Sequence, residues 1–201
     1  VTGMGALTPI GNSLDEFWKN LVDGVSGAAP ITKFDAGLFK TQFACEVKNF
    51  NVEELIERKE ARKLDLFSQY AMFSSIEAIN DSGIDIEKVN LDRCGVVGGS
   101  GIGGLGTFQE ECFNYAAGDG TPKFNPFFIP KMIVDIAAGH ISMKFGFRGP
   151  NYVTVSACAS ATNALIDSLM LIQLGKADVI VSGGSEAAVN IAGIGGFNAL
   201  R

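Results

Sequence analysis

The residue best placed to do chemistry is Cys158, which lies where a short run of apolar residues gives way to a helical pattern. Residues 152–156 are typical of a buried strand, and residues 159–174 are typical of a helix. A tight turn between such elements pushes its central residue out of the sheet, toward the unpaired N–H groups of the helix N-terminus. Those groups favour the thiolate form of a cysteine and can also hold a developing oxyanion.

Cys158 also has a plainer interpretation, because a free cysteine is most often a small buried apolar residue. The nucleophile interpretation is supported by Ala157 and Ala159, whose small side chains let a substrate approach the thiol closely. Position alone leaves both interpretations open.

The other three cysteines, Cys45, Cys94 and Cys112, form no C-x-x-C pair with one another or with Cys158. This spacing is not that of a zinc knuckle or a redox dithiol, so we predict no metal and no cofactor. A disulfide framework is not expected in a glycine-rich domain of this size without secretory features. We therefore expect reduced thiols and a cytoplasmic location.

The composition predicts a domain with a sizeable core, because 47% of the 201 residues are hydrophobic and 19% are charged. The net charge of −6 disfavours a nucleic-acid binder, which needs a basic surface to contact phosphates. The longest apolar stretches fall short of the roughly 20 residues that span a bilayer, so no membrane span is expected. The sequence begins at Val1 without a methionine, as if inside a first strand, and a truncated domain is expected.

Helical and strand patterns alternate along the chain. The strands expected at residues 94–99, 152–156 and 178–182 are apolar on both faces, which is typical of a largely parallel sheet with helices on both sides. Residues 28–50 have no regular pattern. Helices are expected over residues 13–23, 65–81, 105–117, 133–145 and 159–174.

Residues 149–161, Gly-Pro-Asn-Tyr-Val-Thr-Val-Ser-Ala-Cys-Ala-Ser-Ala, resemble the nucleophile signature of the elongating β-ketoacyl-acyl-carrier-protein synthases. The resemblance covers the whole chain, because further segments match the family in the same order. It implies an α/β, thiolase-like fold of αβαβα layers, in which residues 1–201 form the N-terminal βα repeat with a mostly parallel mixed sheet, and the C-terminal half is absent. The other matching segments are residues 1–12, 98–106, 125–130, 138–141, 178–186 and 193–197.

The resemblance assigns a role in fatty-acid elongation to Cys158, which would accept an acyl chain from acyl carrier protein as a thioester. A malonyl unit is then decarboxylated, and its enolate attacks that thioester. The resemblance also implies an acyl pocket and a homodimer, with Phe128 reaching across the dimer interface. Without it, the large apolar residues would be interpreted as ordinary core. The matching pocket positions are Ile102, Phe128, Ala157, Gly193 and Phe197.

Four basic residues, Arg58, Lys59, Arg62 and Lys63, share one face of an expected helix through their i, i+4 spacing. Such a run is usually a solvated helix face. The resemblance implies instead that Lys59, Arg62 and Lys63 belong, together with Arg201, to the patch that docks acidic acyl carrier protein.

The chain contains one histidine, His140, whereas the family uses two histidines and a supporting lysine to stabilise the charge that decarboxylation develops. By the resemblance, those three residues belong to the absent half. His140 matches a segment that precedes the nucleophile strand, so we expect it to be structural and to be satisfied by hydrogen bonds inside the fold. The 201-residue chain alone is therefore expected not to condense.

Other functions are compatible with parts of the sequence. Gly101 to Gly106 is a formal G-x-G-x-x-G, but a dinucleotide site needs an acidic residue at the end of the next strand, about 20 residues on. That distance falls between Pro122 and Pro130, which cannot be a central strand. Non-catalytic dimer partners of the chain-length-factor type lack the cysteine, so Cys158 favours the enzyme. A polyketide-type ketosynthase shares the signature and stays open, as does a purely structural fragment.

Overall fold

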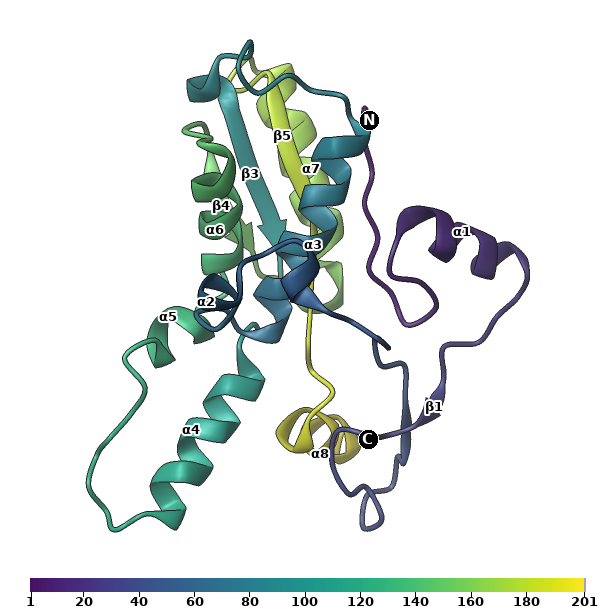
Figure 1. Cartoon of the computed structure of the whole chain (residues 1–201), viewed down its shortest axis with the longest axis vertical. Helices are drawn as coiled ribbons and strands as arrows, with labels where there is room; N and C mark the ends of the chain where they lie inside the picture. The colour runs from purple at the N-terminus through teal and green to yellow at the C-terminus, as the bar shows by residue number, and fades with distance from the viewer. Residues whose placement is uncertain (201) are drawn as a thin grey trace.

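The computed structural model describes residues 1–200. A three-stranded sheet forms its centre, and helices surround the sheet (Figure 1). The strands are β1 (Ala29–Pro30), β2 (Phe43–Ala44), β3 (Cys94–Gly99), β4 (Asn151–Thr154) and β5 (Val179–Gly184). The α-helices are α1 (Leu14–Val22), α2 (Arg58–Ala61), α3 (Leu66–Asp81), α4 (Leu105–Ala117), α5 (Phe128–Met132), α6 (Ile136–Phe145), α7 (Ser160–Gln173) and α8 (Ile191–Ala199). Short 3-10 turns occupy Val52–Glu54, Leu91–Arg93 and Ala157–Ala159.

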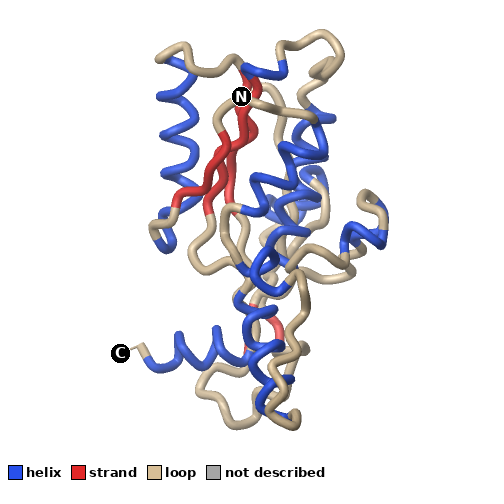
Figure 2. The backbone as a smooth tube through the Cα atoms, turned by 90° about the vertical axis from the view of Figure 1, so that its left-hand side faces the viewer, coloured by secondary structure: helices blue, strands red, loops and turns tan. Residues whose placement is uncertain are grey.

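The central sheet has the order β4-β3-β5, and all its strands are parallel. Val97 in the middle strand is paired with Tyr152 on one side and with Ser182 on the other. Helix α7 covers one face of the sheet, while α3 and α6 cover the other (Figure 2). Because the strands are parallel, their carboxyl ends meet at one edge, where ligands bind in α/β folds.

The core lies where α3 and α6 pack on the sheet. Phe67 of α3 and Val97 of β3 have no exposed surface, and Cys94 and Val96 are almost as buried. Full burial of a Val or Phe side chain contributes about 1.5–3 kcal/mol, so this layer holds the strands in place. The burial also decides the role of Cys94, which is a small core residue.

Helix α7 contacts the sheet with one face only. Ala164 and Ser168 are buried against the strands, whereas Leu165, Leu169 and Met170 on the other face are about half exposed. The chain therefore forms an α/β/α sandwich whose α7 layer has an uncovered apolar surface. No helix within residues 1–200 combines the length and the apolar character that a membrane crossing needs.

Most expected elements are confirmed, with small shifts at their ends, but three features differ. The first strand expected at Val1 is wrong: residues 1–7 run beside α3, and the backbone N–H groups of Met4 and Ala6 donate to Asp81 and Glu77. The apolar stripe of α1 is not buried: Phe17 is half-buried at the edge of an apolar cavity, and Trp18 is 63% exposed. A separate short helix, α5, precedes α6, because the chain turns at Ile133.

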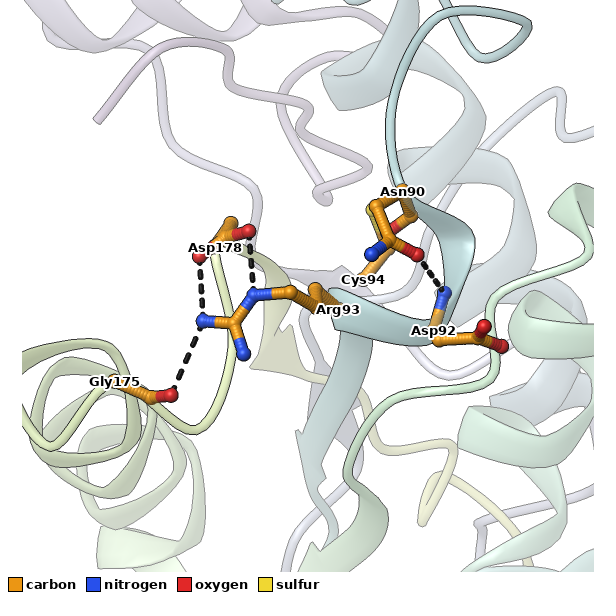
Figure 3. A network of polar contacts seen from close by, with 6 residues as sticks. All are labelled: Asn90, Asp92, Arg93, Cys94, Gly175 and Asp178. Atoms are coloured by element: carbon orange, nitrogen blue, oxygen red, sulfur yellow. Dashed lines mark hydrogen bonds and ion pairs between the residues drawn. The ribbon is translucent and has the colours of Figure 1, made fainter.

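An ion pair joins β3 and β5 at the edge opposite the strands' carboxyl ends (Figure 3). Arg93 Nε and Nη2 donate to the two carboxylate oxygens of Asp178, each over 2.6 Å, and Nη2 also donates to the carbonyl of Gly175 over 3.1 Å. These hydrogen bonds, followed by the charge of Arg93, hold the pKa of Asp178 below its ordinary value. The pair therefore fixes the register of the two strands where they begin.

Replacing Arg93 by Met is predicted to lower stability in a pH-dependent way. The lowered pKa of Asp178 means that the stabilisation is fully present well above the unfolded value of about 3.9 and is lost as the pH falls through the folded value. Urea midpoints of the two proteins should therefore differ at pH 6, and the difference should be smaller at pH 3. Arg58→Met is the matched control, because Arg58 makes one exposed contact of 3.3 Å with Glu53. An Arg93→Met effect of equal size at both pH values would contradict the prediction.

Candidate active site

Cys158 lies on the sharp turn that joins β4 to α7, and its side chain is exposed. The turn contains Ala157 with φ +51°, a left-handed conformation that costs an L-residue about 1–2 kcal/mol. Strain of this kind is retained where the surrounding structure enforces it, and it concentrates at functional sites. The expected strand–turn–helix corner is confirmed.

The turn is held by Ser160, the first residue of α7, which is 3% exposed. Its hydroxyl accepts from the Ser156 N–H over 2.9 Å and donates to the Ala157 carbonyl over 2.7 Å. Thr154 Oγ1 donates to the Ser160 carbonyl over 2.7 Å. These bonds tie Ser160 to Thr154, Ser156 and Ala157, so the backbone on both sides of Cys158 is fixed. The Cys158 side chain itself remains exposed. Sequence reasoning missed Ser160, and its only signal was a small hydroxyl residue two places after the cysteine.

Glycines allow α7 to begin directly on the strands. A Cβ atom on Gly99 would lie 2.5 Å from the backbone carbonyl of Ser160, and one on Gly184 would lie 2.6 Å from the Cβ of Ala161. Both distances are shorter than any real contact, so neither position admits a side chain. The tightness of the corner therefore depends on the carboxyl ends of β3 and β5.

A glycine-rich loop follows β3 and lies against the cysteine turn. Its successive N–H groups, those of Gly101, Ile102 and Gly103, donate to the carboxylate of Glu186 over 2.8, 2.9 and 3.2 Å. Consecutive N–H groups of this kind form an anion-binding concavity. Here the chain's own carboxylate, that of Glu186, fills this concavity.

The structure brings together only part of the predicted acyl pocket. Ile102 lies on the glycine-rich loop and is 41% exposed, and Ala157 is next to Cys158. Phe128 is at the start of α5, where its ring stacks on two other aromatic rings. Gly193 and Phe197 are on α8, which contacts α4, the helix on which α5 also packs (Figure 1). The pocket assignment stays a prediction.

The main apolar cavity lies elsewhere. It has a volume of about 470 Å³ and lies between the N-terminal segment, α3 and the sheet, with Met4, Phe67 and Val97 among its lining residues. Neither Cys158 nor any of the predicted pocket residues lines it. The predicted acyl-pocket residues are therefore separate from this cavity.

The basic face differs from the expectation. Helix α2 ends at Ala61, and both Ala61 and Leu64 are buried core residues. Lys63 is paired with Glu60 over 2.7 Å. Lys59 and Arg62 are exposed and make no ion pair with any residue of the 1–200 range.

The four cations therefore do not share one helical face. Arg58 is held by Glu53. Arg201 lies outside the described residues.

His140 lies on α6, and its charged neighbours are Glu60 and Lys63. Burial lowers its pKa, partly opposed by Glu60. The ring makes no side-chain hydrogen bond within the described chain, so the expectation that internal hydrogen bonds satisfy it is wrong. Its position beside α2 nevertheless gives it no part in the turn of Cys158.

A Gly99→Ala variant is predicted to disrupt the corner, because the new methyl group would overlap the backbone of α7. The free energy of unfolding should fall by at least about 2 kcal/mol. The matched control is Gly139→Ala on α6, where a Cβ meets nothing within 4 Å and should stabilise the helix by up to about 1 kcal/mol. Denaturant unfolding measures both changes, and a neutral Gly99→Ala would contradict the close approach.

The whole chain, including this corner, matches a known protein family. The family profile described as "Beta-ketoacyl synthase, N-terminal domain" matches residues 1–201. The 3-oxoacyl-[acyl-carrier-protein] synthase 2 of Staphylococcus aureus is 43% identical over 201 residues, which are 100% of this chain and 50% of that protein. The chain thus spans about half the length of this relative.

Solved structures share the fold at low sequence identity. The ishigamide ketosynthase/chain length factor superposes with a TM-score of 0.90 at 24% identity, over 98% of this chain and 49% of that one. A ketosynthase solved with the acyl carrier protein of a type II polyketide synthase gives 0.84 at 20% identity, over 100% of this chain and 53% of the other. The fold is therefore thiolase-like, and the chain belongs to the β-ketoacyl synthase family, of which it contains the N-terminal domain.

Proposed function

We propose that this chain is the acyl-accepting half of a 3-oxoacyl-acyl-carrier-protein synthase that acts in fatty-acid elongation in the cytoplasm. The observation that carries the proposal is the exposed Cys158 on a strained corner enforced by Ser160 and Gly99. The 43% identity to an enzyme of that name over the whole chain supports it. The polyketide ketosynthases are 24% identical or less and support the fold alone.

The first half-reaction needs only groups that this chain contains. The Cys158 thiolate attacks the carbonyl carbon of an acyl thioester, and a carbon–sulfur bond forms. The carrier's thiolate leaves and takes up a proton. The backbone N–H of Cys158 donates to no acceptor within residues 1–200, so it is available to the oxyanion of the tetrahedral intermediate.

The second half-reaction needs more than this chain holds. The malonyl unit loses carbon dioxide, its enolate carbon attacks the Cys158 thioester, and the cysteine thiolate leaves. Charge develops on the malonyl thioester oxygen, and hydrogen-bond donors must stabilise it. The one histidine, His140, lies beside α2 and does not serve this step. We infer that the donors belong to the remainder of the protein.

An exposed aromatic ladder supports the proposal of a homodimer. The rings of Phe108 and Phe124 each stack on Phe128, at centroid distances of 6.2 and 5.5 Å. Phe124 in turn stacks on Tyr115. Four of the aromatic residues on this projection, Phe108, Phe113, Tyr115 and Phe124, are more than two-fifths exposed, which is typical of a surface that another chain covers.

The condensation assay tests the proposal directly. The full-length protein, given acyl- and malonyl-acyl carrier protein, should form 3-oxoacyl product, and Cys158→Ser should reduce this product to background. Cys112→Ser on α4 is the matched control and should keep the activity. The 201-residue chain alone should form none. Formation of 3-oxoacyl product by Cys158→Ser at the wild-type rate would refute the role of Cys158 as the nucleophile.

Docking of acyl carrier protein is predicted to depend on two exposed cations, Lys59 on α2 and Arg62 at the C-terminal end of that helix. The double variant Lys59→Glu, Arg62→Glu should lower kcat/KM for acyl-acyl carrier protein by about tenfold at low salt, because the two new carboxylates repel the acidic carrier protein. A free acyl thioester should react normally. Lys88→Glu is the control, since Lys88 is paired with Asp85 elsewhere on the surface. Equal loss with both substrates would contradict a docking role.

A further inference from the structure

We propose that Glu186 is a positioning residue that fixes Ile102 on the loop next to the cysteine turn and so determines which acyl chains the thiol accepts. The inference rests on the proposed function and adds a specificity device to it. Glu186 lies two residues after β5, at the carboxyl edge of the sheet. The loop that it holds follows β3 at the same edge, 83 to 85 positions earlier in the sequence.

Within residues 1–200, three successive N–H groups of this loop have no hydrogen-bond acceptor other than Glu186. Gly101, Ile102 and Gly103 donate to Glu186 alone, and the next residue, Gly104, donates to the carbonyl of Met132. Hydrogen bonds to a carboxylate are about twice as strong as neutral ones. A glycine-rich segment has many alternative conformations, including the φ of +76° at Gly103. Glu186 therefore selects one conformation of the loop among many.

The selected conformation places the loop against the cysteine turn. A Cβ atom on Gly101 would lie 3.5 Å from the carbonyl oxygen of Ala157 and 3.1 Å from the carboxylate of Glu186. A side chain at Gly101 would thus meet both the cysteine turn and Glu186, and the Gly101 N–H itself donates to Glu186 over 2.8 Å. Ile102 is the only residue of the segment 101–104 with a side chain, and it is 41% exposed.

Loss of the carboxylate should therefore release Ile102 and leave Cys158 in place. The turn keeps its own bonds through Ser160, none of which involves Glu186. A mobile Ile102 restricts the acyl chain less, so the preference among chain lengths should flatten. The reactivity of the thiol toward a small reagent should stay the same.

The test compares Glu186→Ala and Glu186→Gln in the full-length protein with Glu110→Gln, an exposed glutamate on α4. Hydrogen exchange of the peptide 100–106 should be about tenfold faster in Glu186→Ala. The ratio of Cys158 acylation rates for the best and worst of butanoyl, octanoyl and hexadecanoyl thioesters should fall by about fivefold or more. Alkylation of Cys158 by iodoacetamide should change by less than about twofold.

Glu186→Gln keeps one acceptor oxygen and should lie between the wild-type protein and Glu186→Ala, which also secures the test if the alanine variant does not fold. Unchanged hydrogen exchange of the peptide 100–106 in Glu186→Ala would show that Glu186 does not fix the loop, and would overturn the inference. Faster exchange with an unchanged chain-length ratio would reduce Glu186 to a structural role and overturn the inference. A wild-type protein that no acyl thioester modifies at Cys158 would instead refute the proposed function, and the exchange data would still report on the loop.

Discussion

The close approach of α7 to the carboxyl ends of β3 and β5 is the constraint on which the rest of the site depends. Gly99 and Gly184 have no Cβ, so the helix can begin directly against the strands. The chain has then only a short turn in which to reverse, which forces Ala157 into the left-handed region. Cys158 is the next residue, and the same geometry that strains its neighbour exposes its thiol.

Local patterns predicted the elements that build this corner. The apolar run of β3 and the periodic run of α4 match the observed bounds, and the turn at Cys158 lies where the strand and helix patterns meet. These features depend on residues that are neighbours in sequence. Glu186 was part of a recognisable segment, yet its partners lie more than 80 residues earlier, and no local pattern indicates such a pairing.

Several features that the sequence did not predict depend on partners distant in the chain. The N-terminal segment has strand-like residues, but the acidic side chains of Glu77 and Asp81 bind its backbone beside α3. The basic run around Arg62 has helical spacing, but the helix ends after one turn at Ala61, a buried core residue. Spacing describes a face only if the helix continues, and tertiary packing decides that.

We propose that the corner alone makes Cys158 the reactive cysteine of this domain. Competition among the four cysteines for a long-chain acyl thioester, followed by intact mass and peptide mapping, tests it most directly. The account predicts a single acyl group on Cys158, formed before any adduct on Cys45, Cys94 or Cys112. Cys45 is also exposed, so exposure alone would modify both. Equal modification of Cys45 and Cys158 in the folded protein would contradict the account.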